Sequence, residues 1–181
     1  YAYMDDLEHI VVVSSTQIPH IARRIVGQAL SIPWGRIRVI KPYIGGGFGA
    51  KQDVILEPMV AFLTLKLGGR PVKIDLSREE CMIGTRTRHP FDIKIRAGVK
   101  KNGTLVALDI DATSNTGAYA SHGHSVAGAA GAKSRLLYPR SAITFHAQTI
   151  YTNTPVAGAM RAYGAPQMIF ALDCTIEAAA R

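Results

Sequence analysis

The chain has 181 residues and a formal net charge of +8 at pH 7, and 48% of it is hydrophobic while 19% is charged. This composition supports one buried core or two small ones, excludes a disordered chain, and contains no apolar run near the roughly 18 residues that span a membrane. The basic balance favours an anionic partner, but an aromatic content of 7% leaves no stacking surface for nucleic acid, and two cysteines exclude a disulfide scaffold.

The first half of the chain predicts strands and helices in alternation. β-Branched residues 10–14 indicate a buried strand, and apolar residues at helical spacing indicate an amphipathic helix over 18–31. These are followed by an expected strand over 36–44, a glycine-rich loop over 45–51, a helix over 54–67 and a strand over 72–76. The succession of strand, glycine loop, helix and strand is typical of a βαβ-like unit.

The second half of the chain changes character. Residues 91–99 and 105–112 alternate between apolar and polar, and Asn102-Gly103 between them predicts an antiparallel hairpin. The small-residue stretch 115–132 is typical either of a lid-like loop or of a helix pressed closely against another surface. The predicted fold class is mixed α/β (α+β) without sequence repeats, and it is completed by a strand over 143–151, a loop over 154–164 and a helix over 167–180.

The glycine-rich loop admits several interpretations. It fails the phosphate-loop template at the residues on both sides of Lys51. It fits the dinucleotide template at Gly45, Gly47 and Ala50, with Asp75 near the position of a ribose partner, which makes a Rossmann-like nucleotide-binding module the alternative hypothesis. A turn that needs glycine for steric reasons alone is a further alternative.

Two residues count against the nucleotide hypothesis. Phe48 is bulky where a pyrophosphate would lie on the backbone, and Asp53 would place a negative charge in the first turn of the expected helix. A third hypothesis joins distant segments, because residues 14–17, 45–51 and 158–167 are each expected where a strand leads into a helix. Three converging helix N-termini would offer N–H donors to oxo and phosphate groups.

These three segments in this order, with Arg88-His89-Pro90-Phe91 between the second and the third, resemble the molybdenum-binding subunit of the xanthine dehydrogenase/aldehyde oxidoreductase family. The resemblance covers essentially the whole chain and is strongest to bacterial xanthine dehydrogenases. It implies that residues 1–181 are part of the first molybdopterin-cofactor-binding domain, a fragment of a longer subunit. The implied reaction oxidises a carbon of an N-heterocycle or an aldehyde, with water as the oxygen source.

The resemblance also implies roles for particular residues. Cofactor contacts fall on Gln17, Gly47, Phe48, Gly49 and Arg161. Gln17 would hydrogen-bond an oxo ligand of molybdenum, the Phe48 backbone would pack against another face of the metal, and Arg161 would make a main-chain contact. A neutral amide can donate to a metal-oxo group without adding charge.

Substrate contacts fall on Tyr163, whose aromatic face suits a planar ring, and on Gln52, where purine-oxidising members often carry glutamate. The chain departs from the family at Ala162, which replaces the usual glycine, and near Ala129, where animal xanthine oxidases carry a substrate-orienting arginine. Purine is therefore a plausible substrate, and a different ring recognition is expected.

Several parts of the implied enzyme are expected outside this chain. No residue matches the motif of the general-base glutamate, so no catalytic residue is assigned, and Glu57 is interpreted as a helix-surface carboxylate. The iron–sulfur centres and FAD would lie on partner subunits, and the pterin would be either the plain form or the cytosine dinucleotide. We expect the chain alone to be inactive, and its unpaired thiols favour the cytoplasm.

Other residues could carry chemistry of their own. His122 and His124 could bind a metal, although hydrogen-bonded histidines in a loop are the favoured interpretation. Cys81 could be a reactive thiol, although a partly buried cysteine is favoured. The basic stretch at residues 86–89 could contact a phosphate of the pterin or form a solvated turn, and the sequence leaves both open.

Overall fold

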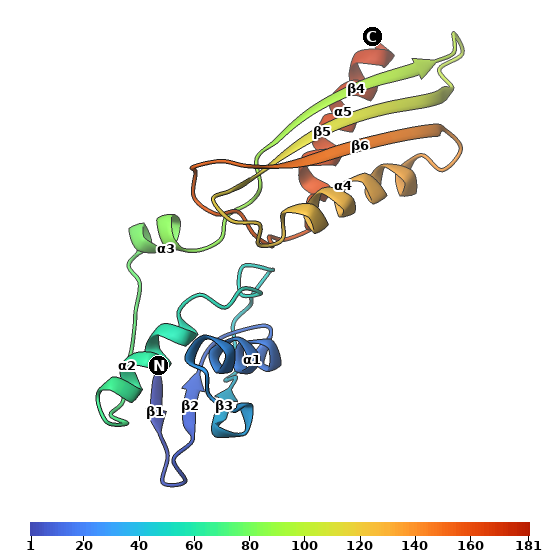
Figure 1. Ribbon diagram of the computed structural model, residues 1–181. Helices are drawn as coiled ribbons and strands as arrows, with labels where there is room; N and C mark the ends of the chain where they lie inside the picture. The colour runs from blue at the N-terminus through green and yellow to red at the C-terminus, as the bar shows by residue number, and fades with distance from the viewer. The chain divides into compact units, whose positions relative to one another are not determined.

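The computed structural model describes residues 1–181, which form two compact units, Tyr1–Thr85 and Arg86–Arg181 (Figure 1). Each unit contains its own three-stranded sheet and its own hydrophobic core. Both units mix helices and strands, which confirms the predicted fold class. No helix has the length and apolar character needed to cross a membrane.

The sheet of unit 1 has the order β1-β2-β3, with β1 antiparallel to β2 and β2 parallel to β3. Helix α1 connects the two parallel strands, so the βαβ unit of this part is β2-α1-β3. The core buries Ile10, Val12 and Val26 between sheet and helices. The elements are β1 (Ala2–Met4), β2 (Ile10–Val13), α1 (Pro19–Leu30), η1 (Trp34–Arg36), β3 (Ile37–Ile40), α2 (Glu57–Lys66) and α3 (Arg78–Gly84).

The predicted βαβ unit over residues 36–76 is therefore misplaced, and the strand predicted over 72–76 does not form. Only Val72 pairs, in an isolated antiparallel bridge with Ala2. Ile74 instead packs its side chain against the core. The alternating pattern thus indicated a segment that is buried on one side, but it did not indicate pairing with another strand.

The glycine-rich loop does not open a helix. Helix α2 begins only at Glu57, several residues beyond Ala50, and Asp53 lies before its first turn. A dinucleotide-binding turn must lead directly into a helix whose N-terminus faces the pyrophosphate. The Rossmann-like alternative built on Gly45, Gly47 and Ala50 is therefore wrong.

The sheet of unit 2 has the order β4-β5-β6, with the predicted hairpin between β4 and β5. Gly103 in its turn has φ +83°, a left-handed conformation that favours glycine. Strand β6 lies parallel to β5 and is reached through α4. The elements are β4 (Phe91–Val99), β5 (Leu105–Gly117), α4 (Gly123–Leu137), β6 (Ala142–Tyr151) and α5 (Ala165–Ala180).

The small-residue stretch becomes the end of β5, a short connection and the first part of α4, so of the two alternatives the closely pressed helix is the one that forms. A Cβ atom on Gly131 would lie 2.3 Å from the ring of Phe145 on β6. On β5, Leu108 and Ile110 are buried in the core, while Asp109 on the opposite face pairs with Arg96 of β4. Helices α4 and α5 contact each other and together cover the core face of the sheet (Figure 1).

The two units repeat one order of elements, although the sequence shows no repeat. Each has a hairpin, a helix that leads to a third strand parallel to the second, and a further helix. The packing also repeats, since α1 contacts β3 and α2 contacts β1 in unit 1, while α4 contacts β6 and α5 contacts β4 in unit 2.

Candidate functional site

In unit 1, Gln17 lies between the end of β2 and the start of α1, and it is bound to the glycine-rich loop. Its backbone N–H donates to Lys51 O at 2.9 Å. The N–H of Gly49 donates to Gln17 Oε1, also at 2.9 Å. The structure therefore brings together two of the predicted contact residues that are distant in sequence, and we call this pair the Gln17–Gly49 clamp.

Gly47 allows the clamp to form. A Cβ atom at this position would lie 2.3 Å from Gln17 Oε1 and 2.4 Å from Gln17 Cδ, far inside van der Waals contact. Only glycine lets the loop backbone approach the Gln17 side chain this closely. The steric interpretation of the glycines is thus correct at Gly47, and its effect is to place an amide side chain.

The clamp also determines which way the Gln17 amide faces. Since the Gly49 N–H needs an acceptor, the carbonyl oxygen of the amide is directed at the loop. The Nε2 group, with two donors, makes no hydrogen bond within the chain. Two free neutral donors beside a glycine turn fit an oxygen-rich anionic group, as the molybdenum cofactor would present.

Phe48 is held in a strained conformation in the same loop. Its φ of +50° lies in the left-handed region, which bulky residues rarely adopt, and its side chain is 61% exposed. A Cβ atom on Gly46 would lie 2.4 Å from Phe48 Cε2, so the ring lies directly over the Gly46 backbone. Strain of this kind persists where the surroundings enforce it, and it clusters at functional sites.

Gln52 closes the loop, since its N–H donates to Gly49 O at 3.0 Å. The carboxylate of nearby Glu57 is engaged structurally, because Ser14 Oγ donates to Oε1 at 2.7 Å and the N–H groups of Ile55 and Leu56 donate to Oε2. A carboxylate with these partners is not a free base. Glu57 is therefore not the helix-surface carboxylate that the sequence predicted but a half-buried group with structural hydrogen bonds.

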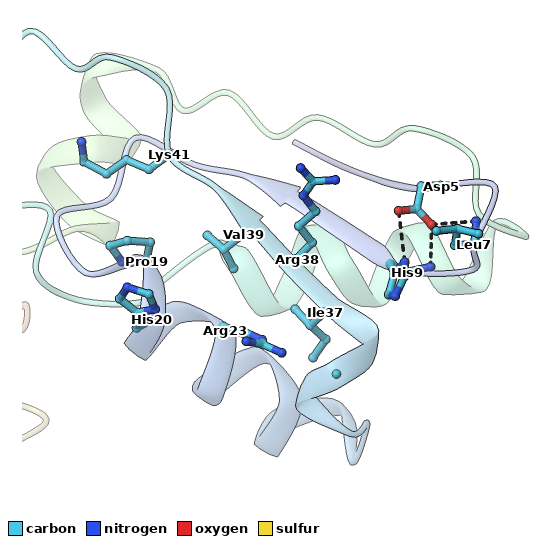
Figure 2. A pocket seen from close by; sticks show the side chains of 11 residues that line it. Asp5, Leu7, His9, Pro19, His20, Arg23, Ile37, Arg38, Val39 and Lys41 are labelled. Carbon is cyan, nitrogen blue, oxygen red and sulfur yellow. Dashed lines mark hydrogen bonds and ion pairs between the residues drawn. The ribbon is translucent and has the colours of Figure 1, made fainter.

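Unit 1 also contains a charged pocket, and neither Gln17 nor Gly49 lines it (Figure 2). Its volume is about 480 Å³, and its lining includes Arg38 and Lys41. Asp5 Oδ1 accepts from the N–H groups of Leu7 and His9, and the backbone N–H of His9 is the largest cause that lowers the pKa of Asp5. None of the residues predicted to bind cofactor or substrate lines this pocket.

In unit 2, Arg161 and Tyr163 belong to the loop that leads into α5. Ala162, Tyr163 and Gly164 have consecutive φ values of +67°, +48° and +90°. The Arg161 carbonyl accepts from Arg88 Nη1 at 3.0 Å. A Cβ atom on Gly164 would lie 2.6 Å from the carbonyl oxygen of Val126 in α4, so the loop is pressed against that helix.

The Tyr163 hydroxyl and His122 Nδ1 form a hydrogen bond of 2.6 Å. The sequence predicted hydrogen-bonded histidines here but did not identify the partner, because the two residues are joined only through the packing of α4 against α5. His124 Nε2 contacts Ser125 Oγ at 3.2 Å, and no group of three or more His, Cys, Asp or Glu side chains could hold a metal. His122 and His124 are thus hydrogen-bonded, as the favoured interpretation predicted, although His124 lies in α4 and not in a loop.

The basic stretch 86–89 and Cys81, which the sequence also offered as candidates, have structural contacts or a structural position. Arg88 binds the Arg161 carbonyl, and Arg86 packs against Gly158, where a Cβ atom would lie 2.7 Å from Arg86 Cβ. This stretch is thus more than a solvated turn. Cys81 is half-buried and forms no disulfide, as the favoured interpretation predicted.

His89 is 2% exposed and therefore almost fully buried in unit 2. Gln167 Nε2 donates to the His89 carbonyl at 2.9 Å, while His89 Nδ1 has no hydrogen-bond partner. Burial is the largest cause that lowers the pKa of His89, the nearby His122 lowers it further, and a contact with the Gly158 backbone offsets these effects only in part. The neutral imidazole is therefore the form that this packing favours.

We expect the free energy of unfolding to fall as the pH falls from about 7.5 to about 5.5. In this range His89 is protonated in the unfolded chain but stays neutral in the folded chain. The contribution of His89 is complete above the unfolded pKa and is lost as the pH falls towards the lower folded value. Urea unfolding at both pH values checks this. His89→Gln should weaken the dependence of the free energy of unfolding on pH, whereas His124→Gln, at an exposed histidine, should leave it unchanged. The same pH dependence in both variants would contradict the prediction.

Comparisons with known proteins agree with the geometry. The family model described as the molybdopterin cofactor-binding domain matches residues 1–181. The chain is 60% identical over 179 residues to the xanthine dehydrogenase molybdenum-binding subunit of Escherichia coli O157:H7, covering 99% of this chain and 24% of that subunit. It is 37% identical over 166 residues to the nicotinate dehydrogenase large molybdopterin subunit of Eubacterium barkeri, covering 92% of this chain and 39% of that one.

A solved structure, the aldehyde oxidoreductase from Desulfovibrio gigas, is similar with a TM-score of 0.87 and 25% identity, over 99% of this chain and 20% of that one. The chain thus spans less than a quarter of the xanthine dehydrogenase subunit that it matches at 24% coverage.

Proposed function

The chain belongs to the molybdopterin cofactor-binding domain family, and from this we propose that it supplies one part of the cofactor pocket of a molybdenum hydroxylase. The reaction we propose is the oxidation of a carbon in an N-heterocycle or an aldehyde, with water as the oxygen source. Its relatives, a xanthine dehydrogenase, a nicotinate dehydrogenase and an aldehyde oxidoreductase, support this class. We further propose that residues 1–181 are part of the first of the cofactor-binding domains.

The observation that carries the proposal is the Gln17–Gly49 clamp. It holds an amide side chain rigidly, with its carbonyl oxygen used and both of its N–H donors free. When bound, the molybdenum cofactor supplies the two-electron oxidation and the transfer of oxygen from water. In our proposal Gln17 donates to an oxo group of this cofactor, and the backbone at Gly47, Phe48 and Gly49 forms the surface beside it.

Unit 2 contributes a second set of contacts in this proposal. Arg161 contacts the cofactor through its main chain, which Arg88 holds by a hydrogen bond to the carbonyl. Tyr163 offers an aromatic face to a planar substrate, and Gln52 of unit 1 recognises ring atoms as donor or acceptor. Because an amide replaces the glutamate of many purine-oxidising members, we propose a heteroaromatic substrate with an altered pattern of hydrogen-bonding groups.

The remaining machinery lies outside this chain in our proposal. The general-base glutamate belongs to the rest of the molybdenum subunit, and iron–sulfur and FAD subunits carry the electrons away. The pterin is either the plain form or its cytosine dinucleotide, and the net charge of +8 suits its phosphate groups in both cases. The free thiols of Cys81 and Cys174 support a cytoplasmic location.

Gln17→Ala in the complete subunit tests the proposal. We expect molybdenum content or turnover to fall about tenfold, while the free energy of unfolding falls by only about 1 kcal/mol for the lost hydrogen bond. Metal analysis, steady-state kinetics and urea unfolding measure the three quantities. Gln28→Ala, the same change at an exposed site on α1, is the matched control and should change none of them. Unchanged metal content and turnover in Gln17→Ala would contradict the proposal.

A further inference from the structure

The repeated order of elements extends to the clamp. In unit 1, Gln17 precedes α1 and binds the loop between β3 and α2 at Gly49. In unit 2, His122 precedes α4 and binds the corresponding loop, between β6 and α5, at Tyr163. Each unit therefore ties the start of its first helix to the loop after its third strand through one polar side chain.

We propose that His122 is a positioning residue that holds the Tyr163 ring as a wall of the substrate pocket. This inference rests on the proposed function, which gives Tyr163 its contact with substrate. The two rings meet edge to face, with centroids 5.7 Å apart and an interplanar angle of 84°. Because the contact runs through the hydroxyl at the edge of the phenol, His122 orients the ring without covering a face on which a planar substrate can stack.

The backbone around Tyr163 explains why such a tie is needed. Left-handed conformations are unfavourable for residues with a Cβ atom, as at Ala162 and Tyr163, so the loop must be held in place by its surroundings. The Tyr163 N–H donates to Met160 O at 2.8 Å, and Gly164 is pressed against α4. These anchors act on the backbone, whereas the His122 bond acts on the far end of the ring.

His122 is itself fixed to the sheet and can therefore serve as an anchor. It is the N-cap residue of α4 and precedes Gly123. A Cβ atom on Gly123 would lie 2.7 Å from Thr116 Oγ1 of β5 and 2.8 Å from Thr149 Cγ2 of β6. The start of the helix thus lies directly on two strands, and this packing fixes the position of the His122 imidazole.

A double-mutant cycle in the complete molybdenum subunit, assembled with its partners, tests the proposal. The variants are His122→Ala, Tyr163→Phe and the double variant, and the probe substrate is xanthine. We expect each single change to raise KM about tenfold, the effect of one lost hydrogen bond at a binding surface, with kcat changed less than KM. The double variant should be no worse than either single one, because both remove the same bond.

Two control variants and two further measurements separate positioning from a structural role. His122→Asn, which keeps a polar atom near the place of Nδ1, should restore most of the KM, and His124→Ala at the exposed neighbour should leave it unchanged. Molybdenum content should stay at the wild-type value in every variant. Urea unfolding of the same variants should also show non-additive effects, and this readout needs no turnover.

If the two single changes multiplied, so that KM rose about a hundredfold in the double variant, the proposal would be overturned, since independent sites behave in this way. Loss of molybdenum in His122→Ala would overturn it as well, because His122 would then support the cofactor site as a whole. A wild-type subunit without molybdenum would instead count against the proposed function itself. Failures confined to the His122 variants count against the positioning role alone.

Discussion

A subunit that carries Gly47→Ala is expected to lose turnover by about a hundredfold, the size of effect that a misplacement of about 1 Å produces at a reacting centre. The added Cβ atom would lie 2.3 Å from Gln17 Oε1, so the Gln17 side chain must leave its place. The bond from the Gly49 N–H to Gln17 is then broken, and the Nε2 donors no longer have a fixed direction.

The fold should survive this change, because the colliding atoms belong to the end of a flexible side chain. We expect the free energy of unfolding to fall by about 1 kcal/mol, the usual value of one hydrogen bond. Metal analysis and kinetics on the complete subunit, together with urea unfolding, separate the effect on the site from the effect on stability.

Gly45→Ala is the matched control in the same loop. Gly45 has an ordinary φ, and a Cβ atom there would have no neighbour within 4 Å. This variant should keep the turnover and the molybdenum content of the wild type. A second control combines Gly47→Ala with Gln17→Ala. The Gln17 side chain with which the added methyl group would clash is then absent, so turnover should fall little below that of Gln17→Ala alone. Equal losses in Gly45→Ala and Gly47→Ala would contradict the clamp.

Gly131→Ala is expected to destabilise unit 2 by about 2 kcal/mol, as overpacking of a core does. Gly131 lies on the face of α4 that touches β6, and the added methyl group would approach the Phe145 ring to 2.3 Å. Either the ring leaves its position or the helix moves away from the sheet, and both lose core contacts. Urea unfolding of the purified chain measures the change.

Gly128→Ala gives the opposite expectation in the same helix. Gly128 is exposed, and a Cβ atom on it would meet nothing within 4 Å. Alanine should therefore stabilise the helix by up to about 1 kcal/mol through its higher helix propensity. Because the chemical change is identical, the difference between the two variants reports the contact of α4 with β6, and equal effects would show that this contact is absent.

Much of the local structure could be predicted from the sequence. The helix at α1, the hairpin at β4 and β5 and the terminal helix follow from periodicity and turn residues, which act between neighbours in the chain. The strand over residues 72–76 was wrong because alternation reports a half-buried side and says nothing of a pairing partner. The stretch 115–132 stayed ambiguous because small residues make a helix only where a surface such as Phe145 receives them.

Some residues of the candidate site could be identified from the sequence, and one could be identified only from the structure. Gln17, Gly47, Phe48, Gly49 and Arg161 were found in motifs that carry a family resemblance, and their roles toward the cofactor remain predictions. His122 was visible only as one of two nearby histidines, since no motif connects it with Tyr163. A hydrogen bond between residues so distant in sequence depends on the packing of whole helices.

The sequence by itself determined most of the local elements and the family, because short-range periodicity and glycine-rich motifs are properties of neighbouring residues. The tertiary structure alone decided that β5 and β6 run parallel, that both units share one order of elements, and that Gln17 and His122 each bind a distant loop. The physical reason is that strand partners, helix contacts and the direction of an amide are set by hydrogen bonds and close packing between distant segments.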